Sequence, residues 1–479
     1  MHRITCLIVG LACFFGASAQ NLVGYNASNY AGVNGIELQP ASIADSRYRV
    51  DVNLGGTSFN VTNNYISVSG DVFRGPYDSS HPFNDPDFFD KYTTRRNDGD
   101  PKSVYFGNTI TMPSAMVSLS PKHSVAFTWN VRNYLNIDGL SPELATLISN
   151  ELDVQNLWNQ RLSSQNVSVQ SMSWAEYGVT YSRVLFNEGP LFFKAGGRVK
   201  LLQGLQAFYL YINDLQYNFS SDTSLSLFQT DISYGHSDNF DFSGDDIRYN
   251  FTGSASFGFD FGGVFEWRPN HEKYKYEKAE DYYAERRDQN KYKLRVGFSV
   301  TDLGRIKYKK GGESANVRAN ISNWDFTDLD ITSVPSIDSI LANTFVVTEE
   351  EGQEFGMALP TAISLQVDYR IWKDFYVNFT PFWAVKRESN ENKIRELTQY
   401  NITPRWDHKW FGVFVPFTYD EFENLHYGAA LRLGAVVFGT RNLTPFVSGG
   451  DVFGADFYFL TKVPIPYGAP SKRKRQQVE

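Results

Sequence analysis

Residues 253–267, GSASFGFDFGGVFEW, alternate between two kinds of side chain. One set of alternate positions includes Phe257, Phe259, Phe261 and Trp267, whereas the other set carries small, polar or charged residues. A period of two is typical of a β-strand with two chemically different faces. The alternation exceeds the about 9–11 residues with which a tilted strand crosses a bilayer, and its aromatic end favours the membrane–water boundary. The stretch therefore predicts a strand with lipid against its phenylalanine side.

The same alternation recurs along the chain after residue 46. It is visible in residues 48–54, 191–201, 294–300, 363–371, 411–419, 427–435 and 455–459. A closed barrel gives every backbone amide in lipid a partner and leaves no open edge, and single-chain bacterial barrels use even numbers of strands. We therefore predict an all-β protein with one closed antiparallel transmembrane β-barrel over residues 46–465, built of about 14 strands with roughly 12 to 16 compatible.

The composition of the 479-residue chain argues against several classes of protein. A mean hydropathy of −0.36 argues against a helical membrane protein, as does the lack of a long apolar stretch after the N-terminus. Both are compatible with a barrel, whose lumen and loops are polar. A formal net charge of −8 argues against a general nucleic-acid binder, so we expect no nucleic-acid partner.

Residues 1–19 have the pattern of a cleaved export signal. Arg3 supplies the charged start, residues 4–15 form an apolar core, and residues 17–19 read Ala-Ser-Ala, which is typical of a cleavage site. Both cysteines, Cys6 and Cys13, lie within this signal. The mature chain is therefore expected to have neither a disulfide framework nor a cysteine nucleophile.

Several runs of residues resemble one family of proteins. They are residues 30–35 (YAGVNG), 38–48 (LQPASIADSRY), 259–267, 293–310 and 454–458. Together they resemble an uncharacterised family of Bacteroidota outer-membrane β-barrel proteins, over most of the mature chain. This resemblance implies a barrel in the outer membrane.

The segment before the first strand resembles a hatch. Residues 20–45 are polar, rich in glycine and without a sustained period. They are similar, more distantly, to the N-terminal Asn-Pro-Ala hatch of FadL-type transporters and of PorV-type barrels of type IX secretion. Gln39, Pro40 and Ala41 stand at that motif here, with glutamine in place of asparagine. The resemblance implies that residues 20–45 fold back and plug the lumen.

Charged residues on the inward-facing positions of strands are tolerable only in a wet interior or as pairs. The candidate pore-lining residues are Lys194, Arg198, Lys200, Asp260, Asp368, Arg370 and Arg432. These residues either line a conduction path or form a ladder of salt bridges that fills a closed lumen. Asp45 and Arg47, at the junction of hatch and wall, form either an ion pair that fixes the strand register or a contact that holds a movable plug.

The segments between strands carry no catalytic signature. Asp238, Asp241, Asp245 and Asp246 offer carboxylates to Ca²⁺, but their spacing is not that of an EF-hand, so we predict no metal and no cofactor. The histidines are scattered, and no enzyme is predicted. Residues 141–162 have helical spacing after the capping residue Ser141. The basic tail, residues 466–479, is expected to be a solvated end.

These features predict an outer-membrane transporter or channel for a small molecule, hydrophobic or amphipathic, gated by residues 20–45. Its partners would be membrane lipid and that small ligand. One alternative is a non-transporting scaffold or accessory barrel, in which a protein partner binds the long loops or the hatch. A second alternative is a secreted, soluble β-rich binding protein.

Overall fold

The computed structural model describes residues 22–74, 81–240, 250–279, 282–311, 315–318, 320–325, 346–349, 353–386, 391–447 and 450–469. The expected signal peptide, Asp241, Asp245, Asp246 and the basic residues 472–475 lie outside these ranges. Among the described residues, no helix is long and apolar enough to cross a membrane.

The main sheet is antiparallel and closes on itself, because the last strand pairs with the first. Its strands occupy 14 positions around a ring, which matches the predicted number. Several positions are shared by two or three consecutive strands that continue one another. In order around the ring the positions are β1 (Tyr48–Asn63), β4 (Lys102–Thr111) with β5 (Ser114–Ser118), β6 (His123–Leu140), β7 (Leu162–Glu188), β8 (Leu191–Ser221), β9 (Ser224–His236) with β10 (Ser256–Trp267), β13 (Leu294–Lys309) with β14 (Ala315–Arg318) and β15 (Ile321–Asp325), β16 (Val346–Glu349) with β17 (Glu354–Ala358) and β18 (Ala362–Trp372), β19 (Phe375–Ala384), β20 (Gln399–Asp407), β21 (Phe411–Phe414) with β22 (Phe417–Asp420), β23 (Leu425–Tyr427) with β24 (Ala429–Leu433), β25 (Val436–Thr440) and β26 (Gly454–Pro466).

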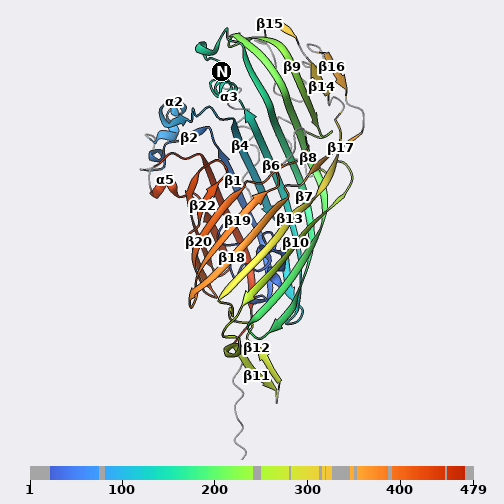
Figure 1. Ribbon diagram of the computed structural model, residues 1–479, viewed down its shortest axis with the longest axis vertical. Coiled ribbons are helices and arrows are strands. Elements are labelled where there is room, and N and C mark those ends of the chain that lie inside the picture. Colours follow the sequence, from blue (N-terminus) through green and yellow to red (C-terminus); the bar gives the residue numbers. More distant parts are fainter. Residues whose placement is uncertain are drawn as a thin grey trace, which may run out of the picture.

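Apart from the 3₁₀ turns within residues 32–43, the smaller elements lie at the two ends of the ring (Figure 1). The two-stranded sheet of β11 (Lys275–Ala279) and β12 (Tyr282–Glu285) projects at the lower end, which we call the hairpin end. At the opposite, long-strand end, β7, β8 and β9 extend beyond most other strands, and β14 and β15 lie beside β9, with β16 beside β14. The remaining elements are the pair β2 (Ile66–Val68) and β3 (Thr93–Arg95), the helices α2 (Phe88–Tyr92), α3 (Pro142–Ser149) and α5 (Thr444–Val447), and the 3₁₀ turns η1 (Gly32–Gly35), η2 (Pro40–Ile43), η3 (Gly70–Phe73), η4 (Pro82–Asn84), η5 (Gln155–Leu157) and η6 (His271–Tyr274).

The two faces of β10 differ as its sequence predicts. Phe261 is 53% exposed on the outer face, whereas its neighbour Asp260 is 1% exposed on the inner face. The strand begins at Ser256, three residues later than the alternation suggests. Gly253 has a φ of +74°, and a Cβ there would lie 2.1 Å from the carbonyl oxygen of Lys307. That conformation belongs to a turn and not to an extended strand.

The predicted helix in the connection after β6 is present. α3 begins directly after Ser141, whose side chain accepts a hydrogen bond from the backbone N–H of Leu144. The helix ends at Ser149 and the 3₁₀ turn η5 follows, so the stretch holds two short helical elements, as its spacing predicts. It packs with Tyr217 and Leu227 at the long-strand end of the ring.

The N-terminal segment, residues 22–47, lies inside the ring. Tyr25, Ile36 and Ala41 are fully buried, and contacts reach strands on opposite sides. The segment bonds, for instance, to Ser182 of β7 and Tyr458 of β26. Because its short 3₁₀ turns leave many backbone carbonyls unpaired, the inward-facing side chains of the wall must satisfy them.

Candidate functional site

Gln39 fixes the middle of the N-terminal segment to three wall strands. Its Nε2 donates to the carbonyl oxygens of Gly263 and Phe298, at 3.2 and 3.1 Å, and to Oε1 of Gln366 at 3.0 Å. Its Oε1 accepts from the backbone N–H of Ala41. The glutamine that departs from the hatch motif therefore makes specific hydrogen bonds.

The wall leaves space for this side chain. A Cβ on Gly262 would lie 1.8 Å from Oε1 of Gln39, and a Cβ on Gly297 would lie 3.1 Å from its Nε2. At Gly196, likewise, a Cβ would lie 2.7 Å from the carbonyl of Pro40. Glycine at these strand positions lets the segment approach the wall backbone closely.

Asp45 is the centre of an ion cluster at the hairpin end of the ring. Its carboxylate lies 2.8 Å from Arg268, 3.0 Å from Arg47 and 3.3 Å from Lys291, and its side chain is 6% exposed. We call these four residues the latch cluster. Arg268 follows β10 and Lys291 precedes β13, so the cluster ties the N-terminal segment to the wall and to the long connection that carries β11 and β12. Asp45 itself has a φ of 48°, which aspartate and asparagine adopt more readily than most residues.

The latch cluster sets the protonation of Asp45. Burial alone would raise the pKa of Asp45, but Lys291, Arg47 and Arg268 outweigh burial and hold that pKa well below its usual value near 4.

A carboxyl with a depressed pKa stabilises the folded state above its unfolded pKa, and the contribution is lost as the pH falls toward the folded pKa. We therefore expect the hydrogen-exchange protection of residues 22–47, corrected for intrinsic rates, to be unchanged between about pH 7 and pH 5 and to weaken only below about pH 4. Protection that already collapses between pH 7 and pH 5 would contradict this assignment of the latch.

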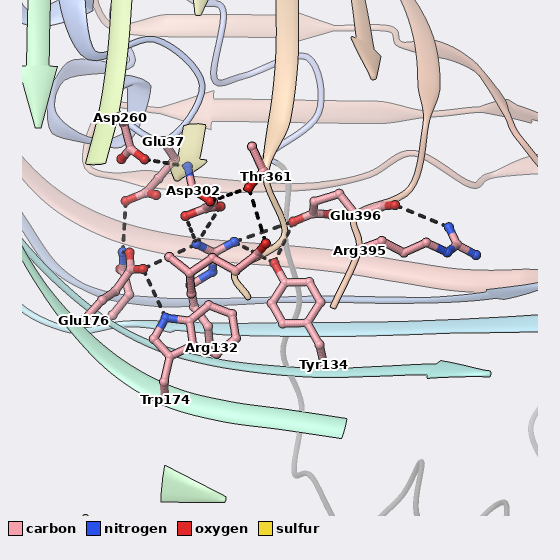
Figure 2. Close-up of polar contacts among 12 residues, drawn as sticks. Glu37, Arg132, Tyr134, Trp174, Glu176, Asp260, Asp302, Thr361, Arg395 and Glu396 are labelled. Atoms are coloured by element: carbon pink, nitrogen blue, oxygen red, sulfur yellow. Dashed lines mark hydrogen bonds and ion pairs between the residues drawn. The ribbon is translucent and has the colours of Figure 1, made fainter. Parts of the chain in front are cut away.

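A second network crosses the middle of the ring and is shown in part in Figure 2. It joins three cationic and five anionic side chains into one set of ion pairs, which we call the central network: Arg132, Arg198, Lys200, Glu37, Glu176, Asp260, Asp302 and Glu396. Arg132 lies 2.8 Å from Asp302, 3.4 Å from Glu176 and 3.6 Å from Glu396. Arg198 reaches Glu37 on the N-terminal segment at 3.0 Å, so the network also holds that segment.

The other predicted inward-facing charges are paired elsewhere in the ring. Asp368 accepts two hydrogen bonds from Arg405, at 2.7 and 2.8 Å. Arg432 contacts Asp407, which in turn accepts hydrogen bonds from Ser28 of the N-terminal segment. Lys194 and Arg370 are the two predicted residues outside these ion pairs.

Lys194 and Arg370 lie toward the hairpin end. Lys194 donates to the carbonyl oxygen of Ala44 at 2.7 Å and so supports the N-terminal segment. Arg370 is half-buried near the end of β18 and donates to the hydroxyl of Tyr274 and the carbonyl of Asn290, both at 3.0 Å. It belongs to the packing of the long connection and not to the central network.

Residues 391–398, between β19 and β20, fold into the ring instead of lying on its surface. We call them the inner loop. Ile394 and Leu397 are buried in an aromatic-rich cluster with Tyr134 and Trp174. Lys393 donates its backbone N–H to Gln170, which lies on β7.

Two charged side chains hold the inner loop in place. Glu396 accepts hydrogen bonds from the hydroxyls of Tyr134, at 2.6 Å, and Tyr105, at 2.8 Å. Arg395 lies 2.7 Å from Asp138 and also contacts Glu421. The inner loop therefore narrows the lumen on the long-strand side of the N-terminal segment.

Sequence reasoning missed the inner loop and the partners that complete the central network. Arg132, Glu176, Asp302 and Glu396 were not among the predicted residues, although the polar alternation of Asn130, Arg132 and Asn136 on β6 was a usable signal.

Two cavities lie on either side of the N-terminal segment. The upper cavity, about 60 Å³, faces the central network and is lined by Asn34 and Glu37 from the segment. The lower cavity, about 40 Å³, is lined by Gln39 and Asp45 from the same segment and by side chains near the latch cluster. The N-terminal segment thus separates the two cavities. In the described part of the chain, no group of three or more His, Cys, Asp or Glu residues is arranged to hold a metal ion.

Residues 40–440 match the sequence model of a family described as "Family of unknown function (DUF5723)". The chain belongs to this family. The match includes the inner loop, Arg268 and Lys291, and all of the central network except Glu37. The predicted resemblance to an uncharacterised family is therefore confirmed, whereas the Bacteroidota origin and the likeness to PorV-type barrels stay predictions. Comparison with the curated proteins gave no match.

The solved structures to which the chain is similar include a FadL homologue and two toluene transporters. A Pseudomonas aeruginosa FadL homologue has 11% identity and a TM-score of 0.41, covering 93% of this chain and 98% of that one. The Pseudomonas putida toluene transporter TodX has 9% identity and a TM-score of 0.31, covering 94% and 97%. The Ralstonia pickettii toluene transporter TbuX has 5% identity and a TM-score of 0.30, covering 92% and 95%. With TM-scores below 0.5, these likenesses support no statement about this chain.

Proposed function

We propose that the protein is an outer-membrane β-barrel that transports a small molecule, with the N-terminal segment as its movable plug. The membrane part of the proposal rests on the outer face of the ring. Exposed apolar side chains occur on strands all around it: Leu54, Val117, Phe127, Val179, Val199, Phe261, Phe298, Tyr369, Phe379, Ile402, Val413, Phe417, Leu433 and Phe457. A soluble protein rarely exposes a contiguous apolar area of this kind, whereas a spanning barrel requires it.

The lengths of the connections give the orientation. Most turns at the hairpin end are short, such as residues 189–190, 373–374 and 434–435 between consecutive strands. The connections at the long-strand end include residues 141–161 and 385–398. Outer-membrane barrels have short turns on the periplasmic side and longer extracellular loops. The hairpin end, the latch cluster and the end of β26 would therefore face the periplasm.

The single observation that carries transport is the partition of the lumen. The N-terminal segment separates an upper from a lower cavity, and apart from its peptide bond to β1 it is held there, in the described part of the chain, by non-covalent contacts. Many of these contacts are side chains of the wall that bind backbone carbonyls, as from Lys194 to Ala44 and from Ser299 to Leu38. Displacing the segment would join the cavities without breaking the ring. The hatch-like motif of residues 39–41 resembles that of FadL-type transporters, and this sequence resemblance suggests a hydrophobic or amphipathic molecule as the ligand.

Asp45→Asn tests the plug. Asparagine keeps the shape and tolerates the positive φ, but the three cations of the latch cluster lose their shared carboxylate. Breaking a buried ion pair costs about 3–5 kcal/mol, so the displaced state should become at least about tenfold more populated. We expect faster swelling of liposomes that contain the variant in an isotonic solution of a small neutral solute.

Asp85→Asn is the matched control, because Asp85 is an ion-paired aspartate in an exterior connection at the long-strand end. Liposomes that contain this control variant should swell at the wild-type rate. Asp45→Asn liposomes that also swell at the wild-type rate would count against a latched plug.

A scaffold role is the second candidate, and the long-strand end favours it. β7 and β8 have 27 and 31 residues, far more than a bilayer requires, and carry α3 beyond the ring. A protein partner on this extension would be retained in a detergent pull-down by the full chain and lost when residues 141–161 are replaced by a short turn. The soluble alternative predicts a protein that stays in solution without detergent.

A further inference from the structure

The central network has more negative than positive charge. Its eight side chains comprise three cations and five carboxylates, which gives a formal charge of −2. All three cations are at most 2% exposed, and each contacts at least two carboxylates. The excess of carboxylates is therefore not compensated within the network.

The excess charge is concentrated at the upper cavity. Four carboxylates of the network line the cavity, whereas only one of its three cations, Arg132, does so. The carboxylates are those of Glu37, Asp260, Asp302 and Glu396. Arg198 and Lys200 lie behind the carboxylates that they contact. A cation in the cavity would meet a negative field in surroundings that are less polar than water, where charge interactions are strong.

One buried polar atom at the cavity, the hydroxyl Oγ1 of Thr109, has no hydrogen-bond partner, in a residue that is 9% exposed. Buried polar groups are normally paired, because an unpaired one costs about 1–3 kcal/mol. The hydroxyl oxygen can coordinate a cation or accept a hydrogen bond from its hydration water.

The size of the cavity limits what it can hold. The centres of water molecules can occupy about 60 Å³ of the cavity, which corresponds to roughly four to six waters at about 10–15 Å³ each. The described residues offer no cluster of three or more acidic, histidine or cysteine ligands that would bind a metal directly. A small monovalent cation with part of its hydration shell fits the volume and the donor set better than a divalent metal does.

We propose that the upper cavity, bounded by the N-terminal segment and the inner loop, is a binding site for a small monovalent cation such as K⁺, Na⁺ or ammonium. The site also makes the opened lumen cation-selective, and this second part rests on the proposed transport function. Glu37 is the residue best suited to test it, because its side chain is 40% exposed and forms one ion pair, with Arg198.

Binding is tested first without any transport. The purified protein in neutral detergent is heated in rising KCl, with N-methylglucamine chloride added to keep the ionic strength constant. A ligand that binds only the folded state raises the melting temperature saturably, and we expect a rise of about 1–3 °C. Glu37→Gln should abolish the K⁺-dependent rise, whereas Glu188→Gln, at the exposed last residue of β7, should keep it.

A wild-type melting temperature that is indifferent to K⁺, or a rise that survives in Glu37→Gln, would overturn the site. The second measurement is the reversal potential of Asp45→Asn in a planar bilayer across a tenfold KCl gradient. We expect the reversal potential to lie close to the equilibrium potential of K⁺. A reversal potential at zero, or close to the equilibrium potential of chloride, would contradict cation selectivity. If no variant conducts, the transport function fails, and the thermal titration still decides the cation site.

Discussion

Arg132→Leu should destabilise the folded protein by about 3–5 kcal/mol, the cost of breaking a buried ion pair from one side. Arg132 is 2% exposed and contacts three carboxylates, and it also stacks 5.0 Å from the ring of Trp174. With leucine at this position, Glu396 would keep only the hydrogen bonds from two tyrosine hydroxyls. Asp302 would keep only its ion pair with Lys200. Urea unfolding in detergent micelles, followed by tryptophan fluorescence, measures the loss.

Two variants serve as controls for Arg132→Leu. Arg183→Leu removes an exposed arginine near the end of β7, and substitutions at such positions usually change stability by less than about 0.5 kcal/mol. Arg132→Lys keeps the charge but lacks the planar guanidinium that contacts several carboxylates at once, so the loss of unfolding free energy should be intermediate. A loss below about 0.5 kcal/mol for Arg132→Leu would mean that the central network does not hold the inner loop and the wall together.

Phe261→Arg should cost about 2–4 kcal/mol in a bilayer, the penalty for arginine on the lipid face near the midplane of a barrel. Phe261 lies near the middle of β10 with its ring on the outer face. In a soluble protein the same change would replace an exposed apolar residue with a solvated charge and would not destabilise. Reversible unfolding from large liposomes measures the difference.

Trp267→Arg is the matched control on the same strand. It also faces outward, but it ends the strand, where arginine costs only about 0–1 kcal/mol because its side chain reaches the interface. If arginine destabilised the protein equally at both positions, its cost would not depend on depth in the bilayer, and the outer face would not be covered by lipid.

The sequence allowed the wall to be predicted because a period of two is a local signal. The alternation around Phe261 and most strand pairings depend on residues close in the sequence, and the predicted number of strands agrees with the ring. The broken position of β9 and β10 was not predictable in this way. There a loop interrupts one ring position, and only pairing with β8 shows that both strands share it.

The interior was harder to predict because its contacts join distant residues. The charges of Arg198, Lys200 and Asp260 were recognised as inward-facing, but the pair between Arg132 and Asp302 spans 170 residues and leaves no periodic trace. Six of the eight residues 391–398 are charged or polar, which is typical of a surface loop. Ile394 and Leu397 among those charges were the one local hint that the loop is buried.

The central claim is that lipid covers the phenylalanine side of the strands. Both cysteines lie at positions 6 and 13, in the expected signal, so a nitroxide attached to Phe261→Cys in the mature protein would label one site. In liposomes, we predict that electron paramagnetic resonance will show strong relaxation of this label by oxygen and weak relaxation by a water-soluble nickel chelate. Strong relaxation by the nickel chelate, or protection from both reagents, would contradict the account.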